Sequence, residues 1–288
     1  MQQRLFRQID VFSHHPGFGN PVAVVLDAQG LSDADMRRFA AWTNLSEITF
    51  LMPPTAAGHA AGADYRLRIF SPRGELPFAG HPTLGTCHAW LQQGHTPRVP
   101  GLVVQESAQG LVQIEHQGET LAFAAPPLQR SKPSPALVPL VASALGLRPH
   151  QIQAAQLLDN GPVWLGLLLD SADTVLGLTP DHARLKDLGQ DVGVIHIAPD
   201  AGANPERPGA VVRAFAAPMG NPEDPVTGSL NASLAQWLIA EGLAPTRYLV
   251  AQGECLGRAG RVYIRQDAQG QVWVGGHTVT CIEGTALL

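Results

Sequence analysis

The sequence places a glutamate where an acid–base catalyst could lie. Glu47 ends the segment Asn-Leu-Ser-Glu at residues 44–47, between a helix-like stretch and an apolar, strand-like one. Burial of a carboxyl group among apolar neighbours raises its pKa toward the range that suits proton transfer near neutral pH. A surface glutamate, or a partner of the helix terminus, is the alternative when this stretch is taken alone.

A second stretch, residues 74–85, joins a histidine to a glycine-led helix start. Gly80 directly precedes His81, and Pro82 follows. Glycine lets the backbone approach a ligand closely, and the N–H groups at a helix start bind anions. His81 could therefore donate a proton or bind a carboxylate, although a lone histidine is more often structural.

A third stretch, residues 221–229, sets two acids before another glycine-led helix start. Glu223 and Asp224 are adjacent, so on an extended chain they point to opposite sides and only one can face a ligand. Gly228 and Ser229 follow at the expected helix start. Acids and serine also favour helix starts as simple caps, which is the alternative interpretation.

Taken together, the second and third stretches predict two helix N-termini that face one cleft. That geometry suits a small molecule with one or two carboxylates, with Glu47 beside the substrate carbon. Metal ligands at motif spacing are not evident, and Cys87, Cys255 and Cys281 are too far apart for a zinc pattern. We expect these three thiols to be small buried hydrophobes.

The elements that must position these residues form two similar halves. Short alternating segments bounded by Gly, Pro or Asn predict strands, and Ser32 with Asp35 predicts a capped helix that reaches residue 43. Apolar helices are expected over residues 81–93 and 229–240, each preceded by an Arg-x-Phe segment. A helix that is apolar on nearly all sides must be enclosed. The proline-rich residues 125–139 are the best linker candidate.

Composition excludes several functional classes. The chain has 288 residues, 45% of them hydrophobic and 15% charged, which is enough for a large core in about two domains. The net charge of −5 and the lack of a Lys/Arg block argue against a nucleic-acid partner. The N-terminal residues lack the apolar segment of a signal peptide, and no apolar run is long enough to span a membrane. We therefore expect a cytoplasmic protein without a nucleic-acid or membrane partner.

These stretches, in this order, resemble the PhzF-like (phenazine-biosynthesis) isomerase family, which is related to diaminopimelate epimerase. The resemblance covers nearly the whole chain. Its motifs are Gly19-Asn20-Pro21, Asn44-Leu-Ser-Glu47, Arg68-Ile-Phe-Ser-Pro72, residues 75–85, residues 223–229, Gln252-Gly253, Gly257-Arg258 and Val274-Gly275-Gly276.

The resemblance implies an α+β fold of the diaminopimelate epimerase type. It has two similar domains, residues 1–128 and 129–288, each a β-barrel-like antiparallel or mixed sheet around a central α-helix. The terminal strand, residues 278–288, is a candidate to return to the first domain. A homodimer is also implied.

The resemblance also implies roles for site residues. Glu47 would be catalytic with His81 and Asp224 as helpers, and Asn20, Gly80, Gly228 and Ser229 would hold the substrate. No metal or organic cofactor is implied.

One departure from the epimerase relatives narrows the mechanism. Those enzymes use a cysteine at each helix start, whereas this chain has Ala79 and Thr227 at the matching positions. Neither side chain has a useful acid–base pKa, which disfavours racemisation by two thiols. We expect an isomerase that moves a proton between carbons of a small carboxylic acid. The alternatives are an epimerase or lyase on a small hydroxy or amino acid, a non-catalytic small-acid binding protein, and a structural or regulatory partner.

Overall fold

The structure, a computed structural model, describes residues 2–288. Contacts between Cα atoms divide the chain into two compact units. Unit 1 comprises Met1–Ala124 and Gly275–Leu288, and unit 2 comprises Ala125–Val274. The predicted domain boundary after residue 128 stays a prediction.

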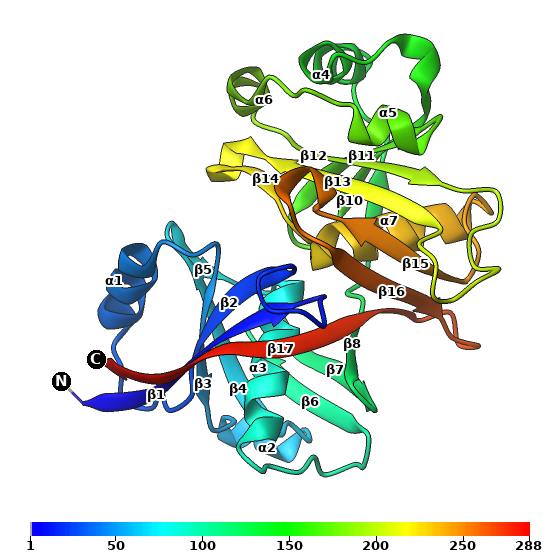
Figure 1. The fold of residues 1–288 in the computed structure, drawn as a ribbon. Coiled ribbons are helices and arrows are strands. Elements are labelled where there is room, and N and C mark those ends of the chain that lie inside the picture. Colours follow the sequence, from blue (N-terminus) through cyan, green and yellow to red (C-terminus); the bar gives the residue numbers. More distant parts are fainter. Residues whose placement is uncertain (1) are drawn as a thin grey trace. The chain divides into compact units, whose positions relative to one another are not determined.

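Strands dominate both units, and helices connect or fill them (Figure 1). The strands of unit 1 are β1 (Gln3–Val11), β2 (Asn20–Val25), β3 (Ile48–Met52), β4 (Tyr65–Ser71), β5 (Gly74–Leu76), β6 (Leu102–Ser107), β7 (Gly110–Gln117) and β8 (Thr120–Ala124). Its helices are α1 (Asp33–Thr43), α2 (Ala56–Ala60) and α3 (Gly80–Gln92).

Unit 2 follows with the same kinds of element. Its strands are β9 (Gln129–Ser131), β10 (Ile152–Asp159), β11 (Val163–Leu169), β12 (Asp191–Ile197), β13 (Ala210–Ala216), β14 (Asn221–Asp224), β15 (Arg247–Gln252) and β16 (Gly260–Gln266). Its helices are α4 (Leu137–Leu145), α5 (Ala172–Leu176), α6 (His182–Leu188) and α7 (Gly228–Ala240). The long strand β17 (Val272–Leu287) begins in unit 2 and continues into unit 1.

Hydrogen bonding closes the sheet of unit 1 into a mixed β-barrel. Its strands follow one another in the order β1, β2, β3, β4, β6, β7, β8 and β17, and β17 pairs with β1 again. The pairs β2–β3 and β4–β6 are parallel and the other pairs for which a register is known are antiparallel. This arrangement confirms the expected α+β class.

Helix α3 is the centre of unit 1. Ten of its residues, from Gly80 to Trp90, are buried, as expected for a helix without a polar face. A Cβ on Gly85 would lie 2.3 Å from the Val22 side chain, so only glycine allows the helix to pack this closely on β2. The helix ends at Gln92, and Gly94 has φ of +85°, a conformation that favours glycine.

Unit 2 surrounds α7 with a mixed sheet in the order β9, β10, β11, β12, β13, β15 and β16. Helix α7 is buried along nearly its whole length and packs on β10, β11 and β16. A separate cluster of apolar side chains joins α4, α5 and α6 to strands β11, β12 and β13. Figure 1 shows these three short helices together beside that sheet.

Several sequence-based expectations need correction. The predicted linker over residues 125–139 begins where unit 2 begins, and it contains β9 and the start of α4. Pro139 fits the first turn of this helix, where its missing N–H costs nothing. Cys87 is buried as expected, but Cys255 and Cys281 are exposed, since one lies in a surface 3₁₀ turn and the other on the outer part of β17. Within residues 2–288, no helix is long and apolar enough to cross a membrane.

Candidate functional site

In unit 1, Glu47 and His81 meet at the start of the central helix. Oε2 of Glu47 lies 3.2 Å from Nε2 of His81, although no well-aligned hydrogen bond joins the two atoms. The His81 side chain is 6% exposed and the Glu47 side chain 18%, and the two facing atoms are themselves shielded from solvent. The arrangement is that of a carboxyl group backed by an imidazole.

Local structure explains how Glu47 reaches this position. Ser32 caps α1 by accepting a hydrogen bond from the Asp35 N–H at 3.2 Å, as the sequence predicted. The helix ends at Asn44, which adopts a left-handed conformation with φ of 54°. Glu47 then lies one residue before the buried strand β3, whose pairing with β2 and β4 fixes the direction of the chain.

Burial controls the charge of His81. Desolvation lowers the pKa of its imidazole from 6.5 to about 3, and a hydrogen bond with the backbone of Pro21 opposes this only in part. Because Nε2 faces Glu47, we assign the bond to the Pro21 carbonyl to the N–H of Nδ1. His81 is therefore neutral at physiological pH and presents the lone pair of Nε2 to the carboxyl group.

The first turn of α3 has backbone N–H groups without a capping side chain. Its N-cap, Ala79, makes no side-chain hydrogen bond, and the first helical bond runs from the Thr83 N–H to the Ala79 carbonyl. The N–H groups of Gly80 and His81 precede that bond. Such N–H groups can bind an anion, and their role in binding the substrate stays a prediction. Asn20, the other predicted binding residue of this unit, is buried at the start of β2, opposite Val11.

In unit 2, Asp224 belongs to a network of buried amide and hydroxyl groups. The Thr227 hydroxyl donates a hydrogen bond to Oδ2 of Asp224 and accepts one from Nε2 of Gln252 at 3.0 Å. Oε1 of Gln252 accepts from the Thr227 N–H at 3.0 Å and from the Asn231 amide at 2.8 Å. Gln252 is 1% exposed and Asn231 2%, so these bonds hold Asp224 and the start of α7 in one fixed arrangement.

Gln252 and Asn231 are the positioning residues that sequence reasoning missed. Gln252 stood only in a motif of the family resemblance, without a role, and Asn231 looked like an ordinary residue of an apolar helix. A buried amide inside such a helix was the one available signal, because it needs partners to be tolerated there.

The predicted binding residues of unit 2 lie at the first turn of α7. Gly228 is its first residue, and the N-cap Thr227 makes no side-chain cap bond. Ser229 accepts hydrogen bonds from two buried side chains, at its hydroxyl from Trp164 at 3.3 Å and at its carbonyl from Asn160 at 2.9 Å.

The adjacent acids of unit 2 take different roles, as their alternation predicted. Glu223 forms a two-point ion pair with Arg213, with distances of 2.9 and 2.8 Å, while Asp224 contacts Thr227. Arg213 also donates to the carbonyls of Val175 and Leu178. Glu223 is thus committed to structure.

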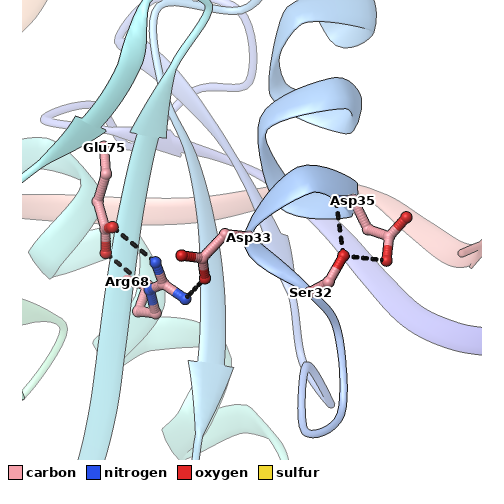
Figure 2. A network of polar contacts seen from close by, with 5 residues as sticks. All are labelled: Ser32, Asp33, Asp35, Arg68 and Glu75. Carbon is pink, nitrogen blue, oxygen red and sulfur yellow. Dashed lines mark hydrogen bonds and ion pairs between the residues drawn. The ribbon is translucent and has the colours of Figure 1, made fainter.

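Unit 1 contains the same ion pair on its corresponding hairpin. Arg68 on β4 contacts both carboxylate oxygens of Glu75 on β5 at 2.7 and 2.6 Å, and it also contacts Asp33 at the start of α1 (Figure 2). The guanidinium of Arg68 lies 5.1 Å from the Phe70 ring, and that of Arg213 lies 5.0 Å from the Phe215 ring. The matching Arg-x-Phe segments therefore carry the same contacts in both units.

The predicted site residues thus form two local groups. Glu47, His81, Gly80 and Asn20 belong to unit 1, and Asp224, Gly228 and Ser229 belong to unit 2. The joining of these groups around one ligand stays a prediction.

A family model described as phenazine biosynthesis-like protein, PhzC-PhzF, matches residues 9–284. The chain belongs to this family. The resemblance stated from the sequence is therefore confirmed, and it extends over both units of this PhzC-PhzF protein.

Curated relatives and solved structures agree with this membership. "Antisense-enhancing sequence 1" of Schizosaccharomyces pombe is 34% identical over 100% of both chains. A trans-2,3-dihydro-3-hydroxyanthranilate isomerase of Pseudomonas aeruginosa is 33% identical over 97% of this chain and 98% of its own. A PhzF-family phenazine biosynthesis protein of Bacillus anthracis has the same fold, with a TM-score of 0.83 at 23% identity and full coverage of both chains. The P. aeruginosa relative, which is named as an isomerase, identifies the PhzC-PhzF protein as an isomerase.

Proposed function

We propose that this protein moves a proton between two carbons of a small carboxylic acid, with Glu47 as the acid–base group and without a cofactor. The observation that carries the proposal is the 3.2 Å contact between Glu47 and His81 at the start of α3. In this contact, a group able to transfer a proton lies beside its buried partner, at the helix end that we propose to bind an anion.

The charge state of the pair supports a role in both giving and taking a proton. A neutral imidazole that presents a lone pair to a carboxyl oxygen favours the uncharged, protonated form of that carboxyl group. We therefore propose that Glu47 carries one proton at rest. Glu47 gives this proton to an electron-rich carbon of the substrate, and the resulting carboxylate takes a proton from another carbon, which restores the pair.

The helix ends are proposed to bind the substrate carboxylate. Amide N–H groups at the start of α3 would serve one side, together with Asn20. Asn20 directly precedes Pro21, whose backbone contacts His81. Gly228 and Ser229 at the start of α7 would serve the other, and Asp224 would balance charge or pass on a second proton. The matching architecture of the two units supports this division of tasks.

The relative from P. aeruginosa suggests the substrate class. Its name specifies trans-2,3-dihydro-3-hydroxyanthranilate, a cyclic unsaturated acid that contains carbons able to exchange a proton. We propose a cyclic unsaturated carboxylic acid of this kind as the substrate and this compound as the first to assay.

Substitution Glu47→Gln tests the catalytic role. The amide keeps the shape of the carboxyl group but does not transfer a proton, so turnover of trans-2,3-dihydro-3-hydroxyanthranilate should fall roughly 100- to 10,000-fold. Glu206, an exposed loop residue, provides the control, and Glu206→Gln should leave the rate unchanged.

Two outcomes would count against the proposal. A Glu47→Gln rate within about tenfold of wild type would mean that another residue is the base. Failure of the wild-type protein to convert this compound would contradict the substrate assignment and leave the role of Glu47 to be assayed with other cyclic acids.

The rival functions differ in their expected products. An epimerase would invert a stereocentre, and a lyase would release a leaving group, although Ala79 and Thr227 offer no thiol at either helix end for two-thiol chemistry. A non-catalytic binding protein would bind the acid without changing it. We also propose that the protein is a cytoplasmic homodimer. Light scattering tests the dimer by comparing the mass in solution with the chain mass of 30.6 kDa.

A further inference from the structure

The loop over residues 12–19 of unit 1 is held firmly at both ends. Phe12 is fully buried, has φ of 68°, and donates its N–H to the His277 carbonyl of β17 at 2.8 Å. A large residue in this conformation is strained and needs support from its surroundings. At the other end, the Gly19 N–H donates to Oδ2 of Asp10 at 2.8 Å. The chain is thus bent to bring the following residues over β17.

This bend places His14 against His277. The two imidazole rings lie 3.5 Å apart between centroids and are tilted by 30°. Glu119, in the turn between β7 and β8, completes the group, and one nitrogen or oxygen atom from each residue lies within 4.8 Å of the others. Three separate segments of unit 1 therefore bring two imidazoles and a carboxylate together.

His277 has the surroundings of a metal-binding histidine. A hydrogen bond from its ring to the backbone carbonyl of Glu119 fixes its orientation and its tautomer. In that tautomer the other ring nitrogen carries the lone pair. Histidines that bind metals almost always donate their second ring N–H in this way, and such bonds orient the ring toward the ion.

We propose that His14, Glu119 and His277 bind a divalent transition-metal ion, for which Zn²⁺ is the probe. Two imidazoles and one carboxylate are a known protein ligand set for Zn²⁺, with the fourth position open to water. Coordination requires the exposed His14 ring to turn about its side-chain bonds until its lone pair points at the ion. Glu119, exposed on its turn, can adjust in the same way.

The proposed metal site shares no residue with the Glu47–His81 pair, and we assign it no part in the proposed proton transfer. The loop that carries His14 does lead directly into Asn20 and Pro21, whose backbone contacts His81. Metal binding would therefore fix one end of the segment that supports the catalytic pair.

Calorimetry with Zn²⁺ on the full, untagged chain tests the proposal without an activity assay. We expect one Zn²⁺ per chain, and binding weakened at least about tenfold by His14→Ala, by His277→Ala and by Glu119→Gln. His150→Ala, which removes an exposed histidine of unit 2, is the control and should bind as wild type does. Co²⁺ should give the visible absorption bands of a four-coordinate site in the wild-type chain and lose them in His14→Ala.

Thermal unfolding provides a second readout. Zn²⁺ at about 100 times its dissociation constant should raise the melting temperature by roughly 2 °C or more in wild type and in the control, but not in His14→Ala. His14 is exposed, so this variant should fold even if His277→Ala does not. Equal Zn²⁺ affinity in wild type and His14→Ala, or no saturable binding to wild type, would overturn the proposal.

Discussion

His81 owes its behaviour to its place at the start of a buried helix. Residue type and spacing singled out Glu47 and His81 in the sequence, because a histidine between glycine and proline at a helix start is unusual. Their 3.2 Å contact could not be predicted, since it depends on how α1 ends and how β3 is aligned with its neighbours. The hydrogen bond between Gln252 and Asn231 could not be predicted either, because the two residues are 21 positions apart in the sequence and meet only in the folded chain.

The protonation state of His81 gives a prediction at this scale. Burial holds its pKa near 3, so the ring should stay neutral with its proton on Nδ1 from pH 8 down to pH 5. Nitrogen NMR of ¹⁵N-histidine-labelled protein measures this directly. A signal of charged imidazolium for His81 at pH 7 would contradict the neutral ring on which the proposed protonation of Glu47 rests.

At the scale of elements, each unit fastens the hairpin before its central helix with an arginine–glutamate pair. Arg68 and Glu75 join β4 to β5 before α3, and Arg213 and Glu223 join β13 to β14 before α7. The pairs fix the chain that enters each helix start, and so they fix the amide groups proposed to bind substrate. The repeated Arg-x-Phe pattern suggested the relation between the halves, but the glutamate partners became evident only from strand pairing.

Loss of one arginine should destabilise the protein by an amount that depends on burial. In unit 2 the side chains of Arg213 and Glu223 are 6% and 8% exposed, so Arg213→Met leaves a buried, unpaired carboxylate and should cost about 3–5 kcal/mol of unfolding free energy. Arg68→Met should cost less, because Glu75 is 29% exposed. Urea unfolding measures both, and Arg213→Met with Glu223→Met should recover much of the loss. Equal losses for the two single variants would refute this explanation.

Element boundaries were predictable where the signal was local. The helices expected over residues 81–93 and 229–240 begin one residue earlier, at Gly80 and Gly228. Strand β17 was predicted only in pieces, over residues 271–275 and 278–288, because its glycines interrupt the alternating pattern. It continues from Val272 to Leu287 because β1 supplies hydrogen bonds along residues 278–287.

At the scale of the whole molecule, repetition of one architecture places a helix N-terminus at the centre of each unit. The sequence predicted this repetition from two short matching segments, and the structure shows it in the enclosed helices α3 and α7. Both helices need a glycine for close packing: Gly85 on α3 itself, and Gly193 on β12, where a Cβ would lie 2.2 Å from the Leu230 side chain. One unit differs chemically, because its helix start has a glutamate and a histidine, while the other has an aspartate held by amides.

Incorporation of deuterium from heavy water tests the central claim most directly. If Glu47 holds an exchangeable proton at rest and gives it to carbon, wild-type protein in D₂O should place one carbon-bound deuterium in the product of trans-2,3-dihydro-3-hydroxyanthranilate at each turnover. Glu47→Gln should place none on the same timescale, and NMR of the product detects both outcomes. A wild-type product without carbon-bound deuterium, or incorporation by Glu47→Gln at the wild-type rate, would contradict the account.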